Sequence, residues 1–150
     1  MVDTVIARKK MMRTNISVAL AASIGPIVFA AGMAFGQGAE RTLRDGVYSE
    51  ARATRGKAVY DAQCANCHDG GSMGPSLKGD DFLATWENKT LRALHGRILE
   101  TMPADAPGTL QPQELLDLMA YLVRANGFAP GPTGFETADD LDTIKIVRSK

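Results

Sequence analysis

The sequence predicts an all-α fold in which short helices are joined by glycine-rich loops. Three observations predict it. Almost no stretch alternates apolar and polar residues with a period of two, helix-capping residues precede apolar stripes, and four glycines and one proline lie between Cys67 and Asp80. With 150 residues, of which 45% are hydrophobic and 23% charged, the chain has the composition of one folded domain.

Residues 1–36 are expected to be an export signal. Four basic residues precede the uncharged run ISVALAASIGPIVFAAGMAF, and Ala34 and Gly36 are small residues suited to cleavage. The basic residues are Arg8, Lys9, Lys10 and Arg13. The alternative is an uncleaved membrane anchor, since the run is just long enough to cross a bilayer, although Gly25 and Pro26 make it a weak one. We therefore expect a periplasmic protein, tethered to the membrane only if this segment is retained.

The rest of the chain divides into an expected domain, residues 37–130, and an extension, residues 131–150. The stretch FAPGPTGFETADD is rich in turn formers, so the extension is expected to run over the surface. Without residues 1–36 the chain holds 13 Lys and Arg against 16 Asp and Glu, a net charge of −3. That charge argues against a nucleic-acid partner, which would need a basic face.

The first two helices of the domain flank the glycine-rich loop. Ser49 can cap a helix that runs to about Gln63, directly before the two cysteines of the chain. After the loop, Asp80 or Asp81 can cap a short helix through FLATW. The loop itself is therefore held between two helix ends.

The next two helices carry clearer boundary signals. Thr90 can cap LRALHGRILET, which must stop at Met102 because Pro103 disfavours helical geometry in the residue before it. The last helix starts at Pro112 and ends at Asn126-Gly127. Both helices carry an apolar stripe, formed by Leu91, Leu94 and Ile98 in the first and by Leu115, Leu118, Met119 and Leu122 in the second.

The motif CANCH, residues 64–68, contains both cysteines of the chain and allows four interpretations. A zinc site needs four ligands, and His95 is the only other histidine. A redox dithiol is expected at a strand-to-helix junction, whereas this motif follows a predicted helix. A disulfide closing so small a loop would contribute little entropy. Cys-x-x-Cys-His is best explained as a c-type haem attachment motif.

The spacing has a chemical reason. Two intervening residues let Cys64 and Cys67 each add a thiol to one haem vinyl group, and the next residue, His68, is then carried beneath the iron as a ligand. Its second ring nitrogen needs an acceptor, commonly a backbone carbonyl. Pro75 follows in the loop and has a free carbonyl to offer.

A sixth ligand would close the iron and leave electron transfer, whereas an open position would suggest ligand binding or peroxidase-like chemistry. The candidates are Met73, Met102, Met119 and His95. Met73 is too close to His68 along the chain, Met119 belongs to a core stripe, and an isolated, partly exposed His95 is more often a surface residue. Met102 combines a loop, a direction set by Pro103 and enough chain to wrap around a haem.

The chain resembles class I monohaem cytochromes c over most of residues 45–130. The resemblance rests on Gly56 and Tyr60 before CANCH, and then on GPSLKG, TMP and LLDLMAYLV. DGVYSEARATRGKAVYDAQCANCH, FLATW, TMPADAPGTL and ANGFAPG further resemble the small cytochromes that serve bacterial pyrroloquinoline-quinone dehydrogenases.

The resemblance implies a cytochrome c fold around one covalently attached haem c. It implies that Cys64 and Cys67 attach the haem, that His68 and Met102 bind the iron, and that Pro75 orients His68. It also implies that Leu77 packs on the ring, that Trp86 approaches a propionate or packs in the core, and that Gly56 and Tyr60 meet Tyr121 where the terminal helices cross.

These features together predict an electron carrier without substrate chemistry of its own, not an enzyme. Its expected partners are redox proteins: a dehydrogenase as donor and a cytochrome or oxidase as acceptor. An apolar shell of Leu77, Leu94, Ile98 and Leu122 would favour the reduced iron. The alternatives are a haem enzyme or gas sensor with a labile sixth ligand, and a colourless thiol-redox or zinc protein.

Overall fold

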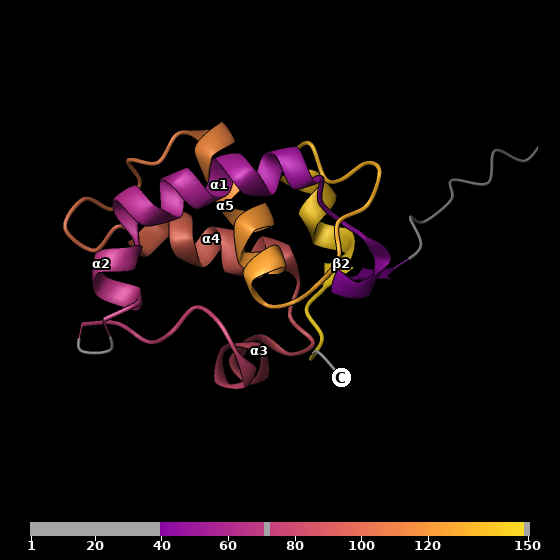
Figure 1. Cartoon of the computed structure of the whole chain (residues 1–150), viewed down its shortest axis with the longest axis horizontal. Helices are drawn as coiled ribbons and strands as arrows, with labels where there is room; N and C mark the ends of the chain where they lie inside the picture. Colours follow the sequence, from indigo (N-terminus) through magenta and orange to yellow (C-terminus); the bar gives the residue numbers. More distant parts are fainter. Residues whose placement is uncertain (1–39, 71–72, 149–150) are drawn as a thin grey trace, which may run out of the picture. The chain divides into compact units, whose positions relative to one another are not determined.

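The computed structural model of the chain describes residues 40–70 and 73–148, and the predicted export segment, residues 1–36, lies outside them. The described elements, in chain order, are β1 (Arg41–Thr42), η1 (Leu43–Asp45), α1 (Glu50–Gln63), α2 (Ala65–His68), α3 (Asp80–Trp86), α4 (Leu91–Thr101), α5 (Pro112–Ala125), η2 (Asp139–Thr143) and β2 (Ile144–Lys145) (Figure 1). The fold is all-α, as predicted, apart from one pair of two-residue strands that the sequence did not predict.

Helices α1 and α5 cross in direct contact, and this is the most extensive packing between any two described elements (Figure 1). A Cβ atom at Gly56 would collide with the backbone carbonyl of Asp117, so the crossing depends on glycine at this position. One turn further along α1, the ring of Tyr60 lies 4.9 Å from that of Tyr121, with the two planes tilted by 48°. The predicted contact of Tyr60 with Tyr121 is therefore confirmed, and Gly56 lies at the same helix crossing, against Asp117.

The predicted helix boundaries hold for α1, α4 and α5, and the predicted cap of α3 is wrong. The side chain of Ser49 accepts the N–H of Arg52, and that of Thr90 accepts the N–H of Ala93, as expected of N-caps. Helix α3 is capped by Gly79 in a left-handed conformation, with φ of 92°, while Asp80 and Asp81 lie in its first turn. Carboxylates in a first turn still face the positive end of the helix, which is why they resemble caps in the sequence.

The C-terminal extension does not simply run over the surface in the way predicted, because several of its apolar side chains are buried in the core. Phe135, Leu141, Ile144 and Ile146 are each at most 1% exposed, and both η2 and β2 pack against α4. Strand β2 pairs in parallel with β1, which places the end of the described chain beside its start (Figure 1). Phe135 and Leu141 stand among turn formers, and the alternation of Ile144, Lys145 and Ile146 is too short to predict a strand, so little in the sequence indicated this burial.

Candidate haem-binding site

The two cysteines and His68 lie on one turn that follows α1 directly. The N–H of Cys64 still bonds the carbonyl of Tyr60 at 2.8 Å, and the carbonyl of Cys64 accepts the N–H of His68 at 3.0 Å. Both thiols are free, and both are half-buried. Burial, with a smaller contribution from Cys67, raises the pKa of the Cys64 thiol to about 11. This is the opposite of the lowered pKa that a redox dithiol needs.

The ring of His68 is held by the loop that follows it. Nδ1 lies 2.6 Å from the carbonyl oxygen of Pro75, and because a carbonyl can only accept, Nδ1 carries a proton. In the neutral imidazole, Nε2 is then the nitrogen with the lone pair. A Cβ atom at Gly74 would lie 2.9 Å from two atoms of the imidazole, so only glycine admits the ring this closely. The structure thus brings His68 and Pro75 together, and leaves one imidazole nitrogen available to a metal.

The same loop is tied to α1 by an ionic cluster. The hydroxyl of Tyr60 donates to Asp69 Oδ1 at 2.7 Å, and Lys78 Nζ lies 2.8 Å from the same oxygen. Lys78 also lies over the Tyr60 ring, 5.3 Å from its centroid. The hydrogen bonds from Lys78 and Tyr60 hold the pKa of Asp69 below its usual range, so its carboxylate stays charged between them.

Asn126 ties the loop to α5. Its amide nitrogen donates to the carbonyl of Leu77 at 3.1 Å, and its oxygen accepts the N–H of Gly79 at 3.0 Å. The side chain is only 7% exposed. The predicted helix stop at Asn126-Gly127 is present, with Gly127 in the left-handed region at φ of 86°. The sequence did not predict the contact of Asn126 with the loop, because an Asn-Gly pair is already explained by the end of a helix.

Met102 ends α4 as predicted. Its backbone is extended, with φ of −130° and ψ of 152°, and its N–H closes the last turn on Ile98 at 2.9 Å. The side chain is half-buried and packs on the hydrophobic core. Of the predicted alternatives, Met73 is 67% exposed and Met119 is fully buried within the core.

His95 is not the partly exposed residue that the sequence suggested. It is 7% exposed and lines a pocket together with Leu99, Leu115, Glu136 and Thr137. It therefore faces residues of the C-terminal segment, and burial lowers its pKa. Among the four candidates for a sixth ligand, Met102 alone is half-buried at the end of a helix and followed by a loop.

The residues predicted to line the site fall into two degrees of burial. Cys64, Leu77, Trp86 and Met102 are all partly buried and pack against the core, while Leu94, Ile98 and Leu122 belong to the core itself. Lys89 Nζ lies 4.8 Å from the centre of the Trp86 ring, so this indole has both a core contact and a cationic neighbour. The two thiols and the imidazole of the CANCH turn fit covalent attachment and ligation of haem c, and the half-buried thioether of Met102 is a ligand type that haem iron takes.

The zinc alternative has no support within residues 40–70 and 73–148, where no group of three or more His, Cys, Asp or Glu side chains could hold a metal ion. Over the same residues, the helices are all too short or too polar to span a bilayer.

The fold is the all-α cytochrome c fold, and its CANCH turn carries the residues of a haem-attachment motif. Residues 51–122 match the family model described as cytochrome C oxidase, cbb3-type, subunit III. The matched region begins in α1, includes the CANCH turn, α3 and α4, and ends in α5. Searches of curated proteins and of solved structures returned no match for this chain.

Proposed function

We propose that this protein is an exported monohaem c-type cytochrome that carries single electrons between redox proteins. The observation that carries the proposal is the turn after α1, where two free thiols stand beside an imidazole whose Nδ1 is taken by the Pro75 carbonyl. Thiol-redox chemistry does not explain why the His68 ring is held with Nδ1 protonated. Metal-binding histidines almost always donate their other ring N–H in this way.

In the proposed site Cys64 and Cys67 hold haem c covalently. Each S–H adds across one vinyl C=C bond, so that sulfur bonds one carbon and hydrogen the other, and no oxidant is consumed. His68 and Met102 would bind the haem iron. Bound haem would supply an iron that cycles between the ferrous and ferric states. A thioether ligand and the apolar wall of Leu94, Ile98 and Leu122 both favour the less charged, ferrous state.

The proposed partners are a dehydrogenase as donor and a cytochrome or oxidase as acceptor. The resemblance to small cytochromes of pyrroloquinoline-quinone dehydrogenases supports the donor, and the matched family is described by the name of an oxidase subunit. Export rests on the basic and then apolar pattern of residues 1–36. A periplasmic location also suits a chain whose cysteines are consumed by covalent attachment.

Covalent attachment is tested first. We expect haem colour to stay with the wild-type chain in acidified acetone, because two thioethers would have to break for release. Replacing both Cys64 and Cys67 by Ala should release the haem under the same treatment. Clean extraction from the wild-type protein would contradict the proposal.

The sixth ligand separates a carrier from a haem enzyme or gas sensor. Met102→Ala should let the ferrous protein bind carbon monoxide and should lower the reduction potential, with haem attachment retained. Met73→Ala should change neither property, because Met73 is exposed. Met119→Ala should keep the axial bond but lose about 2 to 5 kcal/mol of unfolding free energy, since Met119 is fully buried. Carbon monoxide binding to the wild-type ferrous protein would favour the open-site alternative.

A further inference from the structure

Residues 128–148, here called the strap, lie beyond the region matched by the family model and contact both helices that lead to the proposed iron ligands. Helix α1 leads into the His68 turn, and α4 ends at Met102. We propose that the strap positions Met102 by fixing the N-terminal end of α4 relative to that of α1. This inference rests on the proposed function, because it assumes that Met102 binds the iron.

The strap is anchored beside the start of α1. The N–H of Gly131 donates to the carbonyl of Tyr48, and that of Phe135 to the carbonyl of Val47, both at 2.9 Å. Gly134 passes so close to Tyr48 that a Cβ atom would lie 2.5 Å from its Cα. The strap therefore meets the backbone directly before the Ser49 cap of α1.

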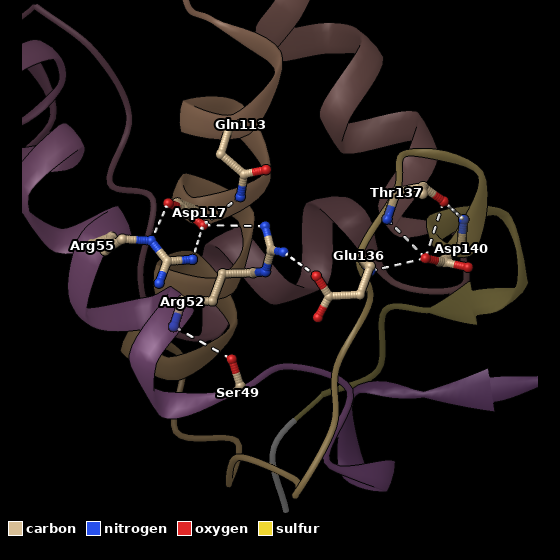
Figure 2. A network of polar contacts seen from close by, with 8 residues as sticks. All are labelled: Ser49, Arg52, Arg55, Gln113, Asp117, Glu136, Thr137 and Asp140. Atoms are coloured by element: carbon tan, nitrogen blue, oxygen red, sulfur yellow. Dashed lines mark hydrogen bonds and ion pairs between the residues drawn. The ribbon is translucent and has the colours of Figure 1, made fainter.

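A charged network fixes the next part of the strap to α1 and α5. Arg52, only 4% exposed, reaches Asp117 at 3.1 Å with one nitrogen and Glu136 of the strap at 2.6 Å with the other. Figure 2 shows the Arg52 side chain between these two carboxylates (Figure 2). Asp140 then stabilises the strap's own turn by accepting the N–H groups of Glu136 and Thr137.

The far end of the strap holds the start of α4. Ile146 accepts the N–H of Asn88 at 2.9 Å and donates its own N–H to Lys89 at 2.8 Å, so it pairs with the turn directly before the Thr90 cap. Thr90 itself forms a bridge with Lys145. The side chain of Ile146 is 1% exposed, and Leu91 in the first turn of α4 is equally buried.

In this geometry, the position of Met102 depends on how the strap holds the other end of α4. Helix α4 has 11 residues and is thus about 16 Å long, and a helix transmits a displacement of one end to the other because its backbone is rigid. The strap spans the N-terminal ends of α1 and α4, while His68 and Met102 follow their C-terminal ends. Loosening the strap should therefore weaken the Met102 bond without touching any ligand.

The test measures how readily added imidazole replaces Met102 in the full-length ferric haem protein, well below its unfolding temperature. We expect Ile146→Ala to raise imidazole affinity by about fivefold or more, the lower end of typical couplings between sites. Ile146→Val should act in the same direction but less, and provides the measurement if the alanine variant fails to fold. The control is Leu118→Ala on α5, which truncates an equally buried side chain of the same size on a helix without a proposed ligand.

Two outcomes would overturn the inference alone. Imidazole affinity could be unchanged in both Ile146 variants, or Leu118→Ala could raise it as much as Ile146→Ala does. A Met102→Ala background separates the two proposals. If Met102→Ala raises imidazole affinity, and Ile146→Ala then adds nothing, the strap acts through Met102. If Met102→Ala leaves the iron's spectrum and imidazole affinity unchanged, the ligand assignment itself fails, and the role of the strap fails with it.

Discussion

Helices α1 and α4 both lead to a proposed iron ligand, but they are held in different ways. Helix α1 lies against α5 with backbone meeting backbone at Gly56, and Arg55 of α1 bonds the buried Asp117 of α5 at 2.7 Å. Helix α4 packs less against α5, and the turn before its first residue is hydrogen-bonded to the strap. The difference suggests that the position of His68 is set within the matched domain, whereas that of Met102 also depends on a segment outside it.

The strap holds α4 mainly through apolar burial. The ion pair between Asp139 of the strap and Arg92 of α4 spans 3.9 Å, and its side chains are 92% and 41% exposed. Such pairs typically contribute about 0 to 1 kcal/mol each. Fully burying one Leu or Ile side chain contributes about 1.5 to 3 kcal/mol. Burial of Leu141, Ile144 and Ile146 therefore contributes more free energy than the ion pair. The packing of the strap on α4 should accordingly change little with salt concentration.

The largest loss of stability is expected from a substitution at the α1–α5 crossing. We expect Gly56→Ala to lower the unfolding free energy by about 3 kcal/mol or more, because the new Cβ would collide with the Asp117 carbonyl and neither backbone can give way cheaply. Denaturant unfolding of the haem-loaded protein measures this. A stable Gly56→Ala protein would show that the crossing is softer than its geometry implies.

Gly96→Ala on α4 is the matched control, because a Cβ there meets nothing within 4 Å. An alanine in a helix interior is favoured over glycine by about 0.5 to 1 kcal/mol, so this variant should be slightly more stable than wild type. The same Gly→Ala substitution would then lower the unfolding free energy at position 56 of α1 and raise it at position 96 of α4.

Sequence reasoning captured what short motifs and periodicity encode. CANCH predicted the turn with both thiols and His68, Pro103 predicted the end of α4 at Met102, and the carbonyl of Pro75 was expected near His68. These features are local, since each is set by residues a few positions apart. The buried face of α5 was also predicted correctly, because apolar residues at helical spacing indicate a buried face.

The missed features depend on contacts between distant segments. Gly74 could be seen only as a loop glycine, because its closeness to the His68 ring is a matter of three-dimensional packing. The contact of Asn126 with the loop was missed because the Asn-Gly pair was already explained as the end of a helix. The strap is held by contacts with the start of the described chain, since Phe135 bonds Val47 and Ile144 pairs with Arg41, and no local pattern in the sequence predicts such contacts. The mistaken exposure of His95 follows from the same omission, since strap residues line its pocket.

The smallest predicted effect is pH-dependent and belongs to the α4–strap side. Burial, with a smaller contribution from Arg92, lowers the pKa of His95 in the folded protein below its ordinary value of about 6.5. The unfolded chain then binds more protons than the folded one as the pH falls below that value. The contribution of neutral His95 to stability is therefore complete above about pH 6.5 and is lost as the pH falls through the folded pKa.

Unfolding free energies of wild type and His95→Leu, compared between pH 8 and pH 5, isolate this contribution. Leucine does not titrate, so the wild type should lose stability relative to the variant as the pH falls. Asp69 and Asp140 have lowered pKa values, so they titrate in a more acidic range and are common to both proteins. Hydrogen-exchange protection should locate the loss: the Ile146 amide, which bonds Lys89, should open at low pH, while amides of α5 stay protected. Equal pH dependence in the two proteins would show that His95 is not the titrating group, and loss of protection in α5 instead would show that the α1–α5 side is the weaker one.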